Sequence, residues 1–385
     1  MNSDDPYTGT SGYVLTSDGT TWVSSAGGVP YTGATGAVNL GAYDLTVHGI
    51  TVGMGAGSVA ENTASGYHAL YSNTSGYSNT ANGYRALIAN TTGYLNTANG
   101  SSALQTNTTG FTNTANGSFA LFYNTTGNSN TANGYQALFN NTTGNENNAF
   151  GVDALYANTT GNLNAAYGNG ALIGNITGTN NTAIGFSADV ASGALSNATA
   201  IGNGAVVAAS NTVRIGNTSV TSIGGQMGWT TLSDGRMKEN IKEEVPGLSF
   251  INSLRPVTYT LNTKKFDNFI MQQMPDSIKA KRMQTDEAYQ TSSSILHTGF
   301  IAQEVEEAAK KVGFNFDGVD APKNENDLYG IRYAEFVVPL VKAVQEQQTT
   351  INAQQTTINA QQTSINAQQK QIDELKLMVE ALMKK

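Results

Sequence analysis

A 17-residue repeat runs through the middle of the chain and constrains its fold more than any other feature. Glycine recurs every 17 residues, and an alanine lies two positions before each glycine. The glycines are Gly66, Gly83, Gly100, Gly117, Gly134, Gly151, Gly168, Gly185 and Gly202. Nine copies without an insertion indicate a structural unit, which must stack on its neighbours because a rung this short cannot fold alone. The sequence therefore predicts a mainly β, elongated solenoid.

Each copy reads roughly N-T-A-x-G-x-x-A-L-x-x-N-T-T-G, which predicts two short extended segments joined by a turn such as Asn90 to Gly93. The apolar content of a rung is little more than one Ala-Leu pair, and these pairs run from Ala69-Leu70 to Ala171-Leu172. One chain can hardly bury enough apolar surface with them. We therefore expect three chains to share an axis, with the alanines and leucines packed between them.

The end of the repeat, Thr199 to Ala205 and Asn211 to Asn217, resembles the β-roll heads of trimeric autotransporter adhesins. This resemblance spans residues 62–217 and implies a homotrimeric β-roll. Tyrosines at variable rung positions form either a ligand-binding stripe or packing between rungs. The candidate receptor contacts are Tyr67, Tyr84, Tyr94 and Tyr135.

Residues 1–56 are rich in glycine, threonine, serine and tyrosine, with short alternating runs at Tyr13–Thr16 and Leu45–His48 that predict strands. The sequence YTGTSG at Tyr7 recurs as YTGATG at Tyr31. The region resembles the connecting region of phage tail-fibre proteins. We expect it to serve attachment or to extend the shaft.

Composition changes abruptly at Ser233. Residues 233–385 hold 18 of the 20 lysines and arginines but only 6 of the 42 glycines. Before this point the chain has two basic residues, Arg85 and Arg214, and eight acidic ones. The stretch from Thr231 to Ile241 therefore spans a domain boundary.

The charged part reads as a small α+β domain. We expect a short helix over 247–256 that runs into Pro256, strands over 257–261, 297–302 and 328–333, a surface excursion over 264–296, and a helix over 303–312.

Four ordered motifs in this domain carry a second resemblance. They are SDGRMKENI at Ser233, LRPVTYTL at Leu254, HTGFIAQEVEEA at His297 and YGIRYAEFVVPLVKAVQE at Tyr329. Together they resemble the C-terminal intramolecular chaperone auto-processing domain of phage tail fibres and tailspikes, the endosialidase-type self-cleaving family. The resemblance implies a trimeric domain that assists folding of the upstream fibre and cuts the Leu232–Ser233 bond. It also implies Ser233 as nucleophile and Lys238 as general base, with Asp234, Arg236 and Asn240 as supporting motif residues.

The chemistry of such a dyad can be argued from the residues. A serine nucleophile needs a base, and the chain has no cysteine and only three scattered histidines, which leaves lysine as a candidate. A free lysine has a pKa of about 10.4, so it must be buried to act near neutrality. Residues five apart on a helix do not align, so either Asp234-Gly235 forms a turn or the lysine comes from a neighbouring chain. The alternative for this motif alone is a helix cap at Ser233-Asp234 with Lys238 as a solvated charge.

The C-terminal tail has heptad spacing. Isoleucines recur at Ile351, Ile358, Ile365 and Ile372, with mainly glutamine at the intervening core positions, such as Gln354 and Gln361. This pattern predicts a trimeric coiled coil, and Pro339 should kink or begin its helix.

Several classes are excluded or left without a signal. A net charge of −8 disfavours nucleic-acid binding. No metal site or cofactor is predicted, no membrane span is visible, and the N-terminus lacks the pattern of a Sec-type signal peptide. An isolated Asp153 or Asp189 does not suggest a polysaccharide-degrading carboxylate pair.

The sequence therefore predicts a homotrimeric tail-fibre or adhesin-like protein for host or surface attachment. Its predicted regions are an N-terminal attachment or shaft region (1–56), a repeat shaft (57–217), a connector (218–232), a self-cleaving chaperone domain (233–336) and a coiled coil (337–385). The enzyme would act once on itself and not on external substrates. Predicted partners are two further copies, baseplate or tail proteins of a phage or phage-like particle, and a host receptor, for example a glycan. The expected location is the particle tail, and outside cells after release. The alternative is an uncleaved trimeric adhesin or fibre whose C-terminal domain is a permanent clamp.

Overall fold

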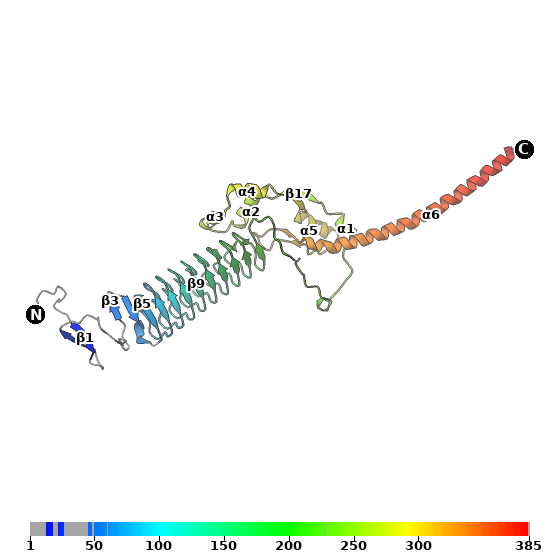
Figure 1. Ribbon diagram of the computed structural model, residues 1–385. Helices are drawn as coiled ribbons and strands as arrows, with labels where there is room; N and C mark the ends of the chain where they lie inside the picture. The colour runs from blue at the N-terminus through cyan, green and yellow to red at the C-terminus, as the bar shows by residue number, and fades with distance from the viewer. Residues whose placement is uncertain are drawn as a thin grey trace.

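The computed structural model describes residues 13–17, 22–26, 45–47, 50–59, 61–226 and 228–383. In it, a solenoid shaft leads to a small α+β domain, from which one long helix extends (Figure 1). Of the predicted N-terminal region, the structure describes β1 (Tyr13–Ser17), β2 (Trp22–Ala26), β3 (Leu45–Val47) and β4 (Ile50–Gly53). The strands predicted at Tyr13 and Leu45 are thus confirmed, and the YTGTSG and YTGATG segments lie outside the described residues.

The shaft is a parallel stack of short strands. After β5 (Thr63–Tyr67), which pairs antiparallel with β4, each rung adds one strand in register, so that Ala81 lies beside Ala98. The strands are β6 (Thr80–Asn82), β7 (Thr97–Asn99), β8 (Thr114–Asn116), β9 (Thr131–Asn133), β10 (Asn148–Phe150), β11 (Ala165–Tyr167), β12 (Thr182–Ile184), β14 (Thr199–Ile201) and β16 (Val213–Ile215).

The prediction of two extended segments in every rung was wrong. Most rungs contain one strand, because left-handed residues turn the chain elsewhere; in one rung they are Arg85, Leu87 and Leu95, with φ of 54°, 51° and 56°. Only near the end of the shaft does a second strand appear, in β13 (Asp189–Val190) and β15 (Val206–Val207), which pair in parallel.

The apolar core of the shaft lies within one chain. The repeated alanines and leucines, such as Ala81 and Leu87, are fully buried and form one continuous cluster. The expectation that these residues pack between three chains was therefore wrong. A narrow rung needs only small side chains to fill its interior, so one Ala-Leu pair and the alanine of the strand are enough.

Two columns of buried asparagines join the rungs. In the first, Asn130 donates its backbone N–H (3.0 Å) and its side-chain amide (3.1 Å) to Asn113 Oδ1, and its own Oδ1 accepts the same pair from Asn147. In the second, Asn141 donates to Asn124 Oδ1 at 2.8 Å. The two columns meet at the Gly144 carbonyl, which accepts from Asn130 at 2.8 Å and from Asn141 at 3.0 Å.

The same ladder explains the glycine and the sequons of the turn. A Cβ on Gly127 would lie 2.4 Å from both Asn124 Oδ1 and the Gly144 carbonyl oxygen, so the turn requires glycine there. The turn also generates Asn-x-Thr sequons, but their asparagines, for example Asn124, are fully buried. Glycosylation at these positions is therefore incompatible with the folded shaft.

The C-terminal domain contains α1 (Leu248–Ile251), β17 (Val257–Thr260), α2 (Thr263–Ile270), α3 (Asp276–Arg282), α4 (Asp286–Ser293), β18 (Leu296–Gly299), α5 (Ala302–Lys311), β19 (Val319–Asp320) and β20 (Gly330–Ile331). Strand β17 pairs antiparallel with β18, and the core gathers Phe250, Val305, Phe316 and Phe336. The strand predicted over 257–261 and the helix predicted over 303–312 are confirmed with small shifts of their ends. The other three elements are present but shorter than predicted: the first helix ends at Ile251, the second strand at Gly299, and the third strand is only Gly330–Ile331. The predicted excursion, however, folds into α2, α3 and α4.

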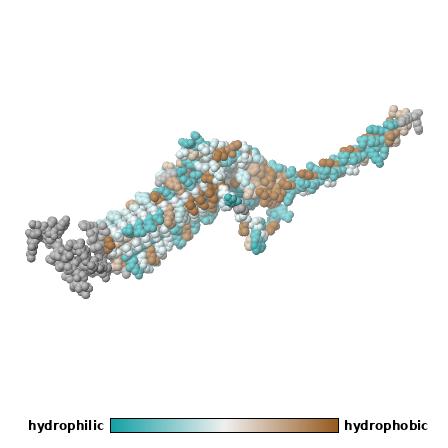
Figure 2. All heavy atoms as spheres, viewed as in Figure 1, coloured by the Kyte–Doolittle hydropathy of each residue, from teal (hydrophilic) through white to brown (hydrophobic). Residues whose placement is uncertain are grey.

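Helix α6 (Val337–Met383) extends away from the domain (Figure 1). Pro339 lies in its first turn, where a missing N–H costs nothing. Its heptad isoleucines are about half exposed, and apolar patches follow the helix along its length (Figure 2). Among the described residues, no helix is both long and apolar enough to cross a membrane.

The asparagine ladder yields a stability test. Replacing Asn130 by alanine leaves the buried N–H of Asn147 without its acceptor, so we expect Asn130→Ala to lower the free energy of unfolding by about 2–4 kcal/mol. Guanidinium unfolding followed by circular dichroism measures this change. The control is Asn133→Ala, an exposed asparagine of the same rung, which should stay within about 0.5 kcal/mol of wild type. Equal losses in both variants would contradict the role of the ladder.

Candidate functional site

The predicted cleavage site lies on an exposed loop. The connection between β16 and α1 projects from the body of the molecule (Figure 1). Its large apolar side chains face solvent, with Trp229 90% and Leu232 82% exposed, and Met237 and Ile241 are similarly open. A Cβ added to Gly224, Gly228 or Gly235 would meet no atom within 4 Å. Around Leu232 and Ser233, the loop is therefore held by its own local structure and not by packing.

A short turn brings the two predicted dyad residues together. Asp234 caps the 3-10 helix η2 (Gly235–Met237), and its carboxylate accepts from the Arg236 N–H at 2.9 Å. The Lys238 N–H then donates to the Gly235 carbonyl at 3.2 Å. Through this reversal of the chain, Lys238 Nζ lies 2.9 Å from Ser233 Oγ. Of the two arrangements expected from the sequence, the structure has the turn within one chain.

The supporting motif residues have structural roles in this turn. The Arg236 guanidinium bonds the Asp234 carboxylate, with Nη2 2.6 Å from Oδ2, and this contact lowers the pKa of Asp234. Asp234 therefore stays ionised and keeps its cap at neutral pH. Asn240 adopts a left-handed conformation with φ of 53°, which asparagine tolerates, just after the dyad.

Both dyad side chains are exposed in the single chain. The contact between Ser233 and Lys238 has the length needed for proton transfer between them. The dehydrated surroundings that a lysine base needs are, however, not supplied by the loop itself. The contact between Ser233 and Lys238 is thus encoded locally, while the environment that the predicted dyad needs is not.

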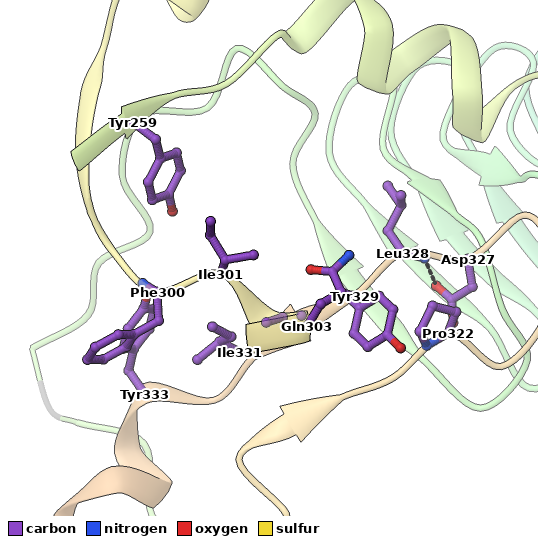
Figure 3. Close-up of a pocket in the computed structure, with 12 residues that line it drawn as sticks. Tyr259, Phe300, Ile301, Gln303, Pro322, Asp327, Leu328, Tyr329, Ile331 and Tyr333 are labelled. Atoms are coloured by element: carbon purple, nitrogen blue, oxygen red, sulfur yellow. Dashed lines mark hydrogen bonds between the residues drawn. The ribbon is translucent and has the colours of Figure 1, made fainter. Parts of the chain in front are cut away.

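A pocket of about 400 Å³ lies in the domain, where three of the four sequence motifs meet (Figure 3). Tyr259 comes from the motif that begins at Leu254. Phe300 to Gln303 come from the motif at His297, and Tyr329 to Tyr333 from the motif at Tyr329. Its lining is largely aromatic and aliphatic, with Asp327 as the single ionisable carboxylate. It suits an apolar side chain better than catalysis. The predicted dyad residues do not line it.

The candidate receptor tyrosines fall into two columns. Tyr67 stacks on Tyr84 with ring centroids 5.5 Å apart, and Tyr135 occupies the same rung position further along. Tyr94 belongs to another column, in which it stacks between Tyr77 and Phe111 at 5.0 and 4.9 Å. The rings therefore do pack between rungs, while Tyr67, Tyr84 and Tyr135 also keep exposed faces.

Sequence reasoning missed a polar cluster between the shaft and α2 to α4. Asp267 Oδ2 accepts from Thr218 at 3.0 Å and from the Tyr289 hydroxyl at 2.9 Å. Burial raises the pKa of Asp267, and burial together with the contact to Asp267 raises the pKa of Tyr289 to about 12. Nearby, a buried ion pair joins Asp189 of the shaft to Arg282 of α3. Its signal in the sequence was Asp189, which interrupts the Ala-Leu pattern of the repeat.

Across the residues that the structure describes, no group of three histidine, aspartate or glutamate side chains is placed to hold a metal ion.

Residues 233–314 match the family model described as chaperone of endosialidase. The match begins at Ser233, where the composition changes, and it supports the resemblance drawn from the motifs; the fourth motif, at Tyr329, lies beyond it. No curated protein and no solved structure matches the chain. The chain thus joins a β-solenoid shaft to a domain that matches the chaperone-of-endosialidase model, a combination that suggests a self-processing, fibre-like protein.

The exposure of the loop predicts where a protease acts first. Brief trypsin treatment of a Ser233→Ala chain should cut after Arg236, Lys238 or Lys242, all of which are exposed. Arg214 and Arg282 serve as internal controls, because both pack between shaft and domain and should resist. Fragment masses at early time points measure the order of cutting. A first cut at Arg282 would contradict the exposed loop or the packed joint.

Proposed function

We propose that this protein is a homotrimeric fibre whose C-terminal domain assists its assembly and then cuts the Leu232–Ser233 bond. The observation that carries the proposal is the 2.9 Å contact between Lys238 Nζ and Ser233 Oγ, at the first residue of the matched chaperone domain. The enzyme acts once on its own chain.

Two features support the trimer. The matched domain family implies self-association, and α6 has a heptad row. This helix presents Ile351, Ile358, Ile365 and Ile372 in one heptad row, about half exposed. An isolated helix gains little from such a row, whereas three copies would bury it in a coiled coil. The glutamines between the isoleucines would form polar layers that set the register.

The position of Ser233 directly after the scissile bond suggests how the cut proceeds. Lys238 takes the proton from Ser233 Oγ, and the oxygen attacks the carbonyl carbon of Leu232. The bond from that carbon to the Ser233 nitrogen breaks, the nitrogen takes up a proton, and an ester to Oγ remains. Water then hydrolyses the ester, which leaves a carboxylate on Leu232 and a free amine and hydroxyl on Ser233.

Trimer assembly is the proposed trigger. The apolar side chains of the loop, Leu232, Met237 and Ile241, are open in one chain and would be covered by neighbouring copies. The same contact would exclude water from Lys238, so the cut would follow correct assembly.

Attachment is the proposed purpose of the fibre. The shaft places Tyr67, Tyr84 and Tyr135 in one outward column, which suits stacking on a host receptor such as a glycan. We place the fibre on a phage or phage-like particle, joined to baseplate or tail proteins. The runner-up is an uncut fibre with the domain as a permanent clamp, and the packed joint between shaft and domain favours it.

Mass analysis tests the cut. Purified wild type should give fragments 1–232 and 233–385, while Ser233→Ala and Lys238→Ala should remain intact. Lys242→Ala is the matched control, because this lysine is exposed on the same loop but does not contact Ser233, and it should cut as wild type does. An intact wild type, or cutting in Ser233→Ala, would refute the dyad.

A second experiment tests the trigger. Ile358→Asp with Ile365→Asp places charge in the heptad row, so we expect loss of the trimer and of cleavage together. Thr356→Asp with Thr363→Asp adds the same charge on the opposite face of α6 and should preserve both. Light scattering and mass analysis measure the two properties. Cleavage at the wild-type rate in a monomeric row variant would show that assembly is not required.

A further inference from the structure

The last rungs of the shaft depart from the repeat at the place where the domain packs. In the preceding rungs the glycine is followed by an Ala-Leu pair with the leucine left-handed, as at Leu172 with φ of 50°. At the next two rungs the sequence becomes Ala188-Asp189-Val190 and Ala205-Val206-Val207. These residues form β13 and β15 instead of the turn.

The residues that replace the Ala-Leu pattern in these two rungs direct side chains toward the domain. Val190 and Val207 remain in the shaft core. Val206 and Ala191 instead join a second buried cluster with Ile270, Met271 and Met274 of the domain. These three belong to the segment 263–293, which comprises α2, α3 and α4 and is called the arm below. The arm lies against the last rungs (Figure 1). The end of the shaft is therefore built as a docking surface for the arm.

A buried ion pair fixes this contact. Arg282 Nη2 donates to Asp189 Oδ2 at 2.7 Å, and the two side chains are 1% and 0% exposed. The Gly174 N–H donates to the same oxygen at 2.9 Å, and a Cβ on Gly174 would approach it to 2.8 Å. The preceding rung has Ala157 at this position, so Gly174 makes room for the carboxylate.

Burying this ion pair has an energetic cost as well as a benefit. Burial raises the pKa of Asp189 although Arg282 opposes this shift, and Asp189 Oδ1 has no hydrogen-bond partner among the residues that the structure describes. Such a pair adds little net stability over an apolar pair, but either charge left alone is strongly unfavourable. The pair therefore ties the arm to one docking position.

Further contacts surround this centre. Arg214 lies over the Phe266 ring at 4.9 Å, and Thr218 donates to Asp267. On the shaft side, every residue of these contacts precedes Leu232. On the arm side, every one follows Ser233. Of the loop between β16 and α1, Thr218 belongs to the joint, whereas Leu232 and Ser233 at the scissile bond make none of these contacts.

We propose that the arm is a clasp that keeps the domain bound to the shaft after the Leu232–Ser233 bond is cut. This inference rests on the proposed function for the cut itself, but the joint does not depend on how the loop is severed. The partner of the clasp is the last part of the shaft, recognised through Val206 and the Asp189 carboxylate. Separation of the two would expose the apolar cluster and break the ion pair.

The test severs the loop without the dyad. A recognition sequence for a site-specific protease is placed between Gly228 and Trp229 of the full-length Ser233→Ala chain, where exposure permits insertion. After complete cutting, size-exclusion chromatography with mass detection should show the two fragments eluting together under native conditions. Fragments that separate would overturn the clasp. Because Ser233 is absent, this outcome would leave self-cleavage untouched, and a failure of self-cleavage would leave the clasp untouched.

Variants of the ion pair test whether it holds the two fragments together. Arg282→Met leaves Asp189 buried and unpaired, so the fragments should dissociate on the order of 100-fold more readily in a dilution series. Asp189→Leu combined with Arg282→Met makes the site apolar and should restore retention. Arg255→Met is the control, because Arg255 forms an exposed ion pair with Glu304 away from the shaft and should retain the fragments. Equal retention in Arg282→Met and wild type would refute the assigned role, and the double variant decides the matter if Arg282→Met fails to fold.

Discussion

The rung-to-rung hydrogen bonds of buried asparagines are the interaction on which the shaft depends. A rung has only one short strand, but backbone bonds outside the strands also join successive rungs, for example from the Leu104 N–H to the Ala120 carbonyl. The turns nevertheless leave polar groups inside the structure. The asparagine side chains satisfy these groups and bridge successive rungs, as Asn130 does between Asn113 and Asn147. Because each buried asparagine bonds to the neighbouring rungs as well as to the turn of its own rung, the repeat must keep its length, which explains a period without insertions.

The loop around Leu232 and Ser233, in contrast to the shaft, is not held by bonds to a neighbouring unit. It has few contacts beyond itself, and its order comes from one capped turn at Asp234. That turn is enough to place a lysine amine beside a serine hydroxyl, but not enough to exclude water. A reactive pair assembled in this way would stay idle in a lone chain, which suits a cut that has to wait for assembly. With the proposed clasp, cutting the loop would not release the domain. The covalent link would be lost, but the arm would still hold the shaft.

Much of this architecture was accessible from local patterns. The rung repeat, the boundary at Ser233, the short helix before Pro256 and the proximity of Ser233 and Lys238 depend on residues close in sequence. The rung interior was misjudged, because a count of apolar residues ignores how little volume a narrow solenoid has to fill. Tyr94 and Tyr67 were also treated as one set, although they belong to different aromatic columns. Both positions are variable in the repeat, and only the path of the rung distinguishes them.

The sequence alone determined the period of the shaft, the change of composition and the heptad row of α6, because each is a regularity of spacing that a helix or a stacked rung must obey. Only the tertiary structure decided that the Ala-Leu pairs are buried within one chain and that the arm packs on the last rungs. It also decided that Arg282 meets Asp189, 93 residues earlier in the chain. Such contacts depend on the path of the whole chain, and no local pattern encodes the partner of a buried charge.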